Sequence, residues 1–231
     1  MKRKTTKKAP QRILVIDIGG TNLKVGGTGH PETLKIPSGP KMTAAVMARD
    51  VKKAAQGWGY QAVSIGYPGL VVNGRPVHEP HNLGPGWVGF DFGKAFGCPV
   101  RVINDAAMQA LGSYEGGAML FLGLGTGLGS AMVSNGELEP MELAHLAYRK
   151  GKTYEDYAGL RGLERMGRKK WQKHVTRIVN HFREVLGADF VVLGGGNSKK
   201  LKVLPAKCRL GDNSNAIRGG LRMWQPPVHF R

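Results

Sequence analysis

The stretch ILVIDIGGTNLK at residues 13–24 decides the fold. Its first six residues form an apolar run that only Asp17 interrupts, which predicts a strand buried on both faces. Gly19 and Gly20 then allow a tight turn. A second strand is predicted at 22–26, so the two strands form a hairpin closed by the glycines.

The same turn carries groups that suit a phosphate. Glycines let backbone N–H groups face an anion, Thr21 adds a hydroxyl donor, and Asp17 is a candidate ligand for Mg²⁺. A plain hairpin with a solvated acid explains these residues equally well, because short glycine motifs are common.

Two further apolar strands end in glycine turns. One strand, at 118–124, runs into GTGLG at 125–129, and another, at 190–193, runs into GGG at 194–196. The first of these turns lacks the Gly-Lys-Ser/Thr of a P-loop, and a strand rather than a helix follows it, which disfavours a dinucleotide fingerprint. Each turn is weak evidence alone, but three at strand ends indicate a site for a phosphoryl donor.

Helical patterns between the strands predict an α/β protein with two domains around a cleft. We expect a disordered basic arm at 1–11, an N-terminal α/β domain at 12–104 and a C-terminal α/β domain at 105–213. A helix at 214–225 is expected to return to the first domain, although its two glycines weaken the helical pattern.

Composition limits the class of protein. The chain has 231 residues, and its two cysteines, Cys98 and Cys208, form neither a disulfide framework nor a metal-ligand pattern. No stretch approaches the ~20 apolar residues of a membrane span. The first apolar run is too short for a secretory signal. We therefore expect a cytoplasmic protein that does not contact membranes.

The net charge of +18 is unevenly distributed. Residues 13–160 hold twelve basic and twelve acidic side chains, whereas residues 161–231 hold sixteen basic and four acidic ones. Such a concentration favours a polyanionic partner. A solvated helix face without a ligand is the alternative, and it usually explains a run of charges.

Two acidic residues and one histidine are candidates for chemistry. Asp105 follows Asn104 at the end of a strand predicted at 100–103, where a carboxylate can accept the proton of an attacking hydroxyl. Asn and Asp are also the preferred helix caps, so a capping role stays open. Glu142 and His145 are three residues apart, which places them on one face of a helix. They are too few for a zinc site, and an exposed pair explains them as well.

The order of the motifs resembles the ROK sugar-kinase family and, within it, the polyphosphate glucokinases. The matching elements, in chain order, are DIGGTNLK (17–24), GYPGLV (66–71), NLGPGW (82–87), INDA (103–106), LGLGTGLGSAMVSNGEL (122–138), ELAHL (142–146), YEDYAG (154–159) and VVLGGGNSKK (191–200). The resemblance implies the two-domain actin-like ATPase (ribonuclease H-like) fold with an interdomain cleft. It also implies a homodimer and a Mg²⁺ cofactor. Many family members carry a Cys-rich zinc motif after the histidine, but residues 146–154 contain no Cys, so we expect no zinc.

The resemblance assigns roles to individual residues. Asp105 becomes the catalytic base. The sugar-binding residues are Asn82, Asn104, Asp105, Glu142, His145 and Glu155. The phosphate or nucleotide side is formed by Asp17, Gly19, Gly20, Thr21, Lys24, Gly125, Thr126, Gly127, Gly194, Gly195 and Gly196, with Asp17 also serving the metal. A track for polyphosphate is expected at Arg165, Arg168, Lys169, Lys170, Lys173, Lys199 and Lys200.

The predicted function is transfer of a phosphoryl group from inorganic polyphosphate, and also from ATP, to the 6-hydroxyl of glucose or a related hexose. One alternative is a strictly ATP-dependent kinase of the same family. Another is a basic nucleic-acid-binding protein, which the sequence pI of about 10.2 would suit. Nucleic acid is the less favoured partner, because no helix-turn-helix, RRM or zinc-finger signature occurs and the neutral segment 13–160 holds most of the kinase-like residues.

Overall fold

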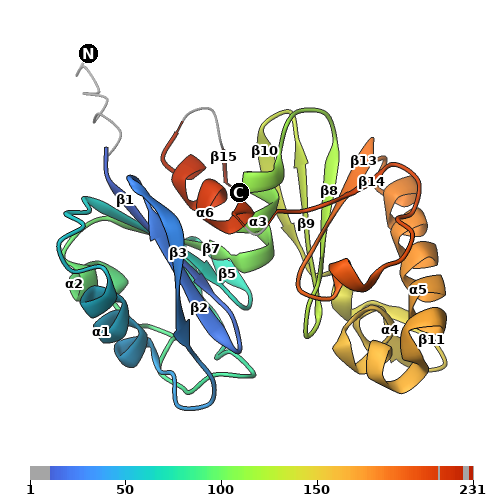
Figure 1. Cartoon of the computed structure of the whole chain (residues 1–231), viewed down its shortest axis with the longest axis horizontal. Helices are drawn as coiled ribbons and strands as arrows, with labels where there is room; N and C mark the ends of the chain where they lie inside the picture. Colours follow the sequence, from blue (N-terminus) through green and yellow to red (C-terminus); the bar gives the residue numbers. More distant parts are fainter. Residues whose placement is uncertain (1–10, 213, 226–228, 231) are drawn as a thin grey trace.

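The computed structural model describes residues 11–212, 214–225 and 229–230, so the predicted basic arm lies outside the described residues apart from Gln11. Two sheets stand side by side, with helices α3 (Asp105–Ser113) and α6 (Asn215–Arg222) between them (Figure 1). Each sheet has its other face covered by further helices. The α/β class predicted from the sequence is therefore observed.

The first sheet has the strand order β3-β2-β1-β4-β7. Its strands are β1 (Ile13–Ile18), β2 (Asn22–Gly27), β3 (His30–Pro37), β4 (Ala62–Tyr67) and β7 (Val100–Asn104). The strands β1, β2 and β3 form an antiparallel meander, while β4 and β7 run parallel to β1. Helices α1 (Ala44–Ala54) and α2 (Phe92–Phe96) pack on the outer face through an apolar core.

The second sheet repeats this arrangement. Its order is β14-β13-β8-β9-β10-β15, with β8 (Met119–Leu124), β9 (Leu128–Ser134), β10 (Glu137–Met141), β13 (Phe190–Gly194), β14 (Cys208–Leu210) and β15 (His229–Phe230). Again an antiparallel meander, β8-β9-β10, is followed by two parallel strands, β13 and β14. The two halves thus share one topology, which is the duplication expected of the predicted fold.

Smaller elements complete the chain. They are β5 (Val71–Val72), β6 (Arg75–Pro76), η1 (Leu143–His145), β11 (Ala147–Arg149), β12 (Lys152–Thr153), α4 (Glu155–Ala158), α5 (Leu160–Val185) and η2 (Ser198–Lys200). The long helix α5 packs on the second sheet through a buried stripe that includes Trp171, Val175, Ile178 and Phe182, at helical spacing. Its backbone is broken at Gly167, where φ is 72°.

The two central helices cross at a pair of glycines. A Cβ atom on Gly112 of α3 would collide with the Asn215 carbonyl, and one on Gly219 of α6 would collide with the Met108 carbonyl. Gly220 in the same way lets α6 pass close to Val15 of β1. The glycines that weakened the sequence-based prediction of this helix are therefore the residues that its packing requires.

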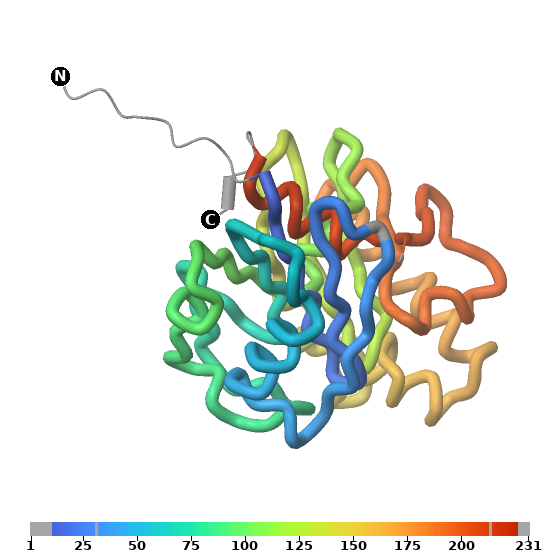
Figure 2. Tube along the Cα trace, turned by 60° about the vertical axis from the view of Figure 1, so that its left-hand side comes forward, coloured from blue at the N-terminus to red at the C-terminus, as the bar shows by residue number. Residues whose placement is uncertain are grey.

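Helix α6 belongs with the first sheet, although it comes last in the chain. Ser64 of β4 donates its hydroxyl to the Gly220 carbonyl at 2.6 Å, and Trp224 Nε1 donates to the same hydroxyl at 2.9 Å. Figure 2 shows this segment, in red, beside the blue N-terminal strands. Helix α3, in contrast, packs on β8 and β9. This packing supports our proposed division of the chain at 104/105 with the last helix returning to the first domain.

Candidate active site

The parallel strands β1, β4 and β7 end at one edge of the first sheet, and predicted site residues stand there. Pairing places Asp17 beside Gly66, and Gly66 beside Ile103. Asn104 and Asp105 follow Ile103 directly. A Cβ atom on Gly66 would lie 3.3 Å from the Cα atom of Asp105, so glycine here allows the start of α3 to approach the sheet.

Asn104, rather than Asp105, caps helix α3. Its Oδ1 accepts the N–H of Ala107 at 3.1 Å, and its Nδ2 donates to the Gly69 carbonyl at 3.1 Å. Asp105 is the first helical residue, and its Oδ1 accepts the N–H of Ala106 at 2.7 Å. Within the described residues its Oδ2 has no hydrogen-bond partner. The capping role that the sequence left open therefore falls on Asn104.

The environment of Asp105 changes its acidity. Burial raises the pKa of this carboxyl to about 7, and the negative charges of Asp17 and Glu142 act in the same direction. The N–H of Ala106 and the positive charge of Lys24 oppose them. A carboxyl group with a pKa close to neutrality is suited to accept a proton during a reaction at neutral pH.

Asp17 and Lys24 face each other across the first hairpin. They are paired residues of β1 and β2, and the Nζ of Lys24 lies 2.9 Å from the Oδ2 of Asp17. The Asp17 side chain is only 6% exposed, so its charge requires such a partner. The turn between them needs its first glycine, because a Cβ atom on Gly19 would lie 2.7 Å from the Asn22 carbonyl oxygen.

The loop that carries Asn82 lies against this turn. A Cβ atom on Gly20 would sit 3.3 Å from the Asn82 Cβ, which brings the predicted sugar contact to the predicted phosphate turn. The loop is held by Glu79, whose carboxylate accepts the N–H groups of Trp87 and Val88 at 3.1 to 3.2 Å. Glu79 was not among the site residues predicted from the sequence.

Glu142 and His145 are brought together, but on the 3₁₀ turn η1 rather than on an α-helix. The Nε2 of His145 is 3.6 Å from the Oε2 of Glu142, and both side chains are exposed. Ser130 fixes this turn, since its hydroxyl donates to the Met141 carbonyl at 2.8 Å and accepts the N–H of Leu143 at 3.3 Å. The charge of Glu142 contributes to the raised pKa of Asp105, so the turn lies on the same side of the protein as that carboxyl, and its contact with sugar stays a prediction.

Glu155 lies against the second glycine turn. Its Oε2 accepts the N–H of Leu128 at 3.3 Å and would collide with a Cβ atom on Gly127. Its Oε1 is 3.5 Å from Arg161. The carboxylate thus supports a turn that we assigned to the phosphoryl donor, and its contact with sugar stays a prediction.

The glycine turns of the second sheet are joined to each other. Strands β8 and β13 are parallel and pair at Gly123 and Gly194. Asn197 then ties the turns together: its backbone N–H donates to the Leu124 carbonyl at 2.9 Å, and its Nδ2 donates to the Gly125 carbonyl at 2.8 Å. Asn197 was not among the site residues predicted from the sequence.

The two halves of the site meet where β9 begins. A Cβ atom on Gly129 would lie 2.7 Å from the Cβ of Ala106, the residue after Asp105. The turn at 125–127 ends two residues before Gly129, and Gly129 contacts the start of α3. This contact brings the glycine turn at 125–127, which is predicted to bind the donor, near the start of α3, where Asp105 lies.

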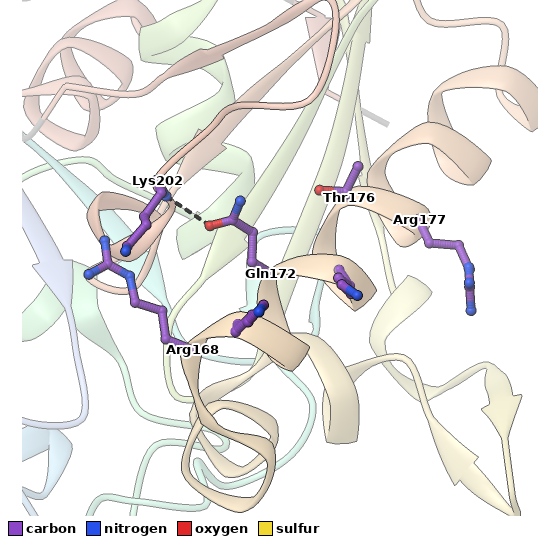
Figure 3. A pocket seen from close by; sticks show the side chains of 7 residues that line it. Arg168, Gln172, Thr176, Arg177 and Lys202 are labelled. Carbon is purple, nitrogen blue, oxygen red and sulfur yellow. Dashed lines mark hydrogen bonds between the residues drawn. The ribbon is translucent and has the colours of Figure 1, made fainter.

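The predicted polyphosphate track is only partly assembled. A pocket of about 700 Å³, which we call the α5 pocket, is lined by Arg168, Lys169, Gln172, Lys173, Thr176, Arg177 and Lys202 (Figure 3). Lys170, Lys199 and Lys200 are exposed outside this lining. Arg165 instead donates to the Asp156 carbonyl at 2.8 Å and stacks on Tyr157. Arg177 and Lys202 were counted in the basic run but not placed in the track.

The donor atoms of the site fit Mg²⁺ better than a metal held by protein alone. Mg²⁺ takes one or two carboxylates and completes its shell with water and phosphate oxygens. Asp17, the predicted ligand, supplies one carboxylate, and it lies close enough to Asp105 to raise the pKa of that carboxyl. Among the described residues, no three His, Cys, Asp or Glu side chains form a group suited to a metal ion. The expectation of no zinc stays a prediction.

Comparisons with known proteins agree with this fold. Residues 13–140 match the ROK family. Polyphosphate glucokinase of Mycobacterium tuberculosis (strain CDC 1551 / Oshkosh) is 30% identical over 207 residues, which cover 80% of this chain and 77% of that protein. The solved structure of inorganic polyphosphate/ATP-glucomannokinase from Arthrobacter sp. strain KM is 25% identical, with a TM-score of 0.73 over 94% of this chain and 98% of that one.

A further solved structure, at lower sequence identity, is similar to this chain in fold only. The ROK family glucokinase from Streptomyces griseus, in complex with glucose and AMPPNP, is 19% identical, with a TM-score of 0.69 over 93% of this chain and 99% of that one. The predicted actin-like α/β fold is confirmed. In the described part of the chain, no helix combines the length and apolarity needed to cross a bilayer.

Proposed function

Since the chain belongs to the ROK family and is a sugar kinase of the glucokinase type, we propose that it phosphorylates the 6-hydroxyl of glucose with inorganic polyphosphate as donor. One observation carries the mechanism. Asp105 has a pKa of about 7, and the start of its helix touches the strand that leaves the donor-side turn at 125–127. A proton acceptor and a phosphate-binding turn thus share one site.

Asp105 acts as the general base. Its carboxylate takes the proton from the sugar hydroxyl as that oxygen attacks phosphorus, which increases the charge on the attacking atom when it is needed. Oδ1 is held by the N–H of Ala106, which leaves Oδ2 for the proton. Asn104 fixes the start of the helix, and with it the position of the base.

Binding groups on both sides orient the reactants. On the sugar side, Asn82 lies beside the first glycine turn, and Glu142 and His145 offer exposed polar atoms that can bind hydroxyls. On the donor side, the backbone amides of the turns at 125–127 and 194–196 are suited to phosphate oxygens. Asp17, together with phosphate oxygens of the donor, would hold Mg²⁺, which would supply positive charge to offset the negative charge of the donor. Positioning of this kind accounts for much of the rate of phosphoryl transfer.

Polyphosphate is preferred as donor because of the charge near the donor-side turns. The segment that leaves the turn at 194–196 carries Lys199, Lys200 and Lys202, and the last of these lines the α5 pocket. A linear chain of phosphates would be held by such a surface in the way that basic grooves hold nucleic-acid backbones. A homodimer and a cytoplasmic location complete the proposal, and family resemblance supports both.

A coupled assay of glucose 6-phosphate formation tests the proposal. Long-chain polyphosphate and ATP are supplied separately, each with Mg²⁺, and mannose and glucosamine are compared with glucose. We expect turnover with polyphosphate at a kcat/KM at least equal to that with ATP. Turnover with ATP alone would identify a strictly ATP-dependent kinase, and an absence of turnover with either donor would refute the function.

A further inference from the structure

We propose that the α5 pocket is a second anchoring site for a linear polyphosphate chain, separate from the turns that hold the reacting phosphates. The inference rests on the proposed donor. Lys169, Lys173 and Arg177 recur every four residues and form one cationic row along α5. From Lys169 to Arg177 the helix rises by about 12 Å, which gives the row room for several phosphates.

The pocket is a built feature with two walls. Opposite α5 stands the segment that contains Lys202, whose backbone N–H donates to the Oε1 of Gln172 at 2.9 Å (Figure 3). One turn earlier on the helix, the Nε of Arg168 donates to the Lys200 carbonyl. These two bonds fix the segment against the helix, so the cation of Lys202 faces the pocket together with those of α5.

The lysines of the pocket, together with Arg177, are not neutralised by neighbours. Lys169, Lys173, Arg177 and Lys202 are exposed, and no carboxylate of the described residues lies within 4.0 Å of their charged groups. Other basic side chains in this half of the protein do pair, as Arg161 does with Glu155. A row of unpaired, exposed cations repels itself and is therefore stabilised by a bound polyanion.

The pocket is reached from the donor site along continuous chain. The glycine turn at 194–196 leads into η2, where Lys199 and Lys200 are exposed, and then into Lys202. A chain that places its terminal phosphate at the turn can follow these lysines into the pocket. ATP has only three phosphates, and a very short oligophosphate also ends before the pocket, so neither gains from it.

Chain length should therefore control the affinity for the donor. A long chain bound at both places is held by two linked contacts, and its second contact benefits from a high effective concentration. The affinity should also fall with rising salt, as it does for other linear polyanions. Short chains and ATP should show a weaker dependence on salt.

The test compares two variants that each lose three positive charges. The first is K169Q/K173Q/K202Q in the pocket. The second, a matched control on the outer helices of the first sheet, is K52Q/K53Q/K94Q. KM is measured for long-chain polyphosphate, for tripolyphosphate and for ATP, with glucose saturating, at several salt concentrations. Binding of long-chain polyphosphate without glucose is measured in parallel by equilibrium titration.

For the pocket variant, we expect KM for long-chain polyphosphate to rise about tenfold, which corresponds to ~1.4 kcal/mol. The slope of log affinity against log salt should become shallower by about one unit for each lysine removed. KM for tripolyphosphate, for ATP and for glucose should not change, and the control variant should behave like the wild type. The inference would be overturned if KM for long-chain polyphosphate rose equally in the two variants. It would also be overturned if KM for tripolyphosphate and ATP rose as much as KM for the long chain.

The binding titration separates the inference from the proposed function. If the wild type transfers no phosphate from polyphosphate but binds the long chain, and the pocket variant binds it more weakly than the control, the donor assignment fails and the anchoring site stands. Single-stranded DNA of equal charge is titrated as well. If it binds as tightly as polyphosphate and loses affinity in the same variant, the pocket is a nucleic-acid site, and our assignment is wrong.

Discussion

The Nζ of Lys24 lies 2.9 Å from the Oδ2 of Asp17, and the charges of both residues act on Asp105. The two influences are opposite, since Asp17 raises the pKa of Asp105 and Lys24 lowers it. The ion pair on the first hairpin therefore moderates the acidity of the proposed catalytic base. It links the first strand of the chain to the start of α3, about ninety residues later.

Removing Lys24 should shift the pH dependence of catalysis. In K24M the negative charge of Asp17 has no partner, so the pKa of Asp105 rises further and the base is protonated at higher pH. We expect the acidic limb of the kcat/KM profile to move up by roughly one pH unit. K53M, which removes a lysine from the outer helix α1, should keep the wild-type midpoint. An unchanged midpoint in K24M would show that the pair does not act on the base.

Ionisation of Asp105 should lower the free energy of unfolding as the pH rises. Because its pKa is raised from 3.8 to about 7, the folded protein keeps a proton that the unfolded chain loses in this interval. The D105N variant has no such group. We expect equal stability of the two proteins near pH 4, and a growing advantage of D105N up to about pH 7 that then stays level. Thermal unfolding at pH 8 should show a gain of at least about 2–4 °C, equivalent to ~1 kcal/mol. A stability difference between D105N and the wild type that narrows with rising pH would contradict the assigned pKa.

Glu79 should position the loop that carries Asn82, the proposed sugar contact. Partial loss of solvation opposes ionisation of this exposed residue, but the N–H groups of Trp87, Val88 and Gly86 outweigh this effect and hold the pKa of the carboxyl below its usual range. E79Q keeps the shape and loses the charge, so the loop that carries Asn82 should loosen. We expect KM for glucose to rise about tenfold while kcat changes little, the pattern of lost uniform binding. E32Q, on the edge strand β3, is the control. A fall in kcat at unchanged KM would assign Glu79 a different role.

Gly219 should be required for the contact between the two sheets. A valine there would drive its side chain into the Met108 carbonyl of α3. We expect G219V to lower the free energy of unfolding by about 1–3 kcal/mol or to prevent folding, because a tightly packed crossing tolerates overpacking poorly. Urea unfolding followed by circular dichroism measures this. Wild-type stability in G219V would mean that the helices do not cross here.

Local patterns in the sequence were enough to predict the frame of the site. The run Ile13–Ile18 is buried at every position, and the glycine turns at 19–20, 125–127 and 194–196 follow strands as predicted. These features depend on neighbouring residues, so a pattern over six to ten positions reveals them.

Other elements lack a local signal. Strand β3 (His30–Pro37) has two prolines and polar residues, and reads as a loop. It forms because it lies at the edge of the sheet, where proline is tolerated. Helix α6 contains two glycines that disfavour a helix in isolation, but its packing on α3 and β1 compensates.

The residues missed in the site owe their roles to distant partners. Asn197 binds the carbonyl of Gly125, 72 residues away. Gln172 lines the α5 pocket, and its side chain accepts the backbone N–H of Lys202, 30 residues away. No spacing rule reports such pairs, so three-dimensional structure was needed to find them.

The central claim is that Asp105 is the base of phosphoryl transfer, and the D105N variant tests it most directly. Glucose phosphorylation is followed with polyphosphate as donor, and glucose binding is measured by calorimetry on the same preparation. We predict that kcat falls at least about 100-fold, whereas the Kd for glucose stays within about threefold of the wild type. Turnover within tenfold of the wild-type rate, in a preparation free of other kinases, would contradict the account.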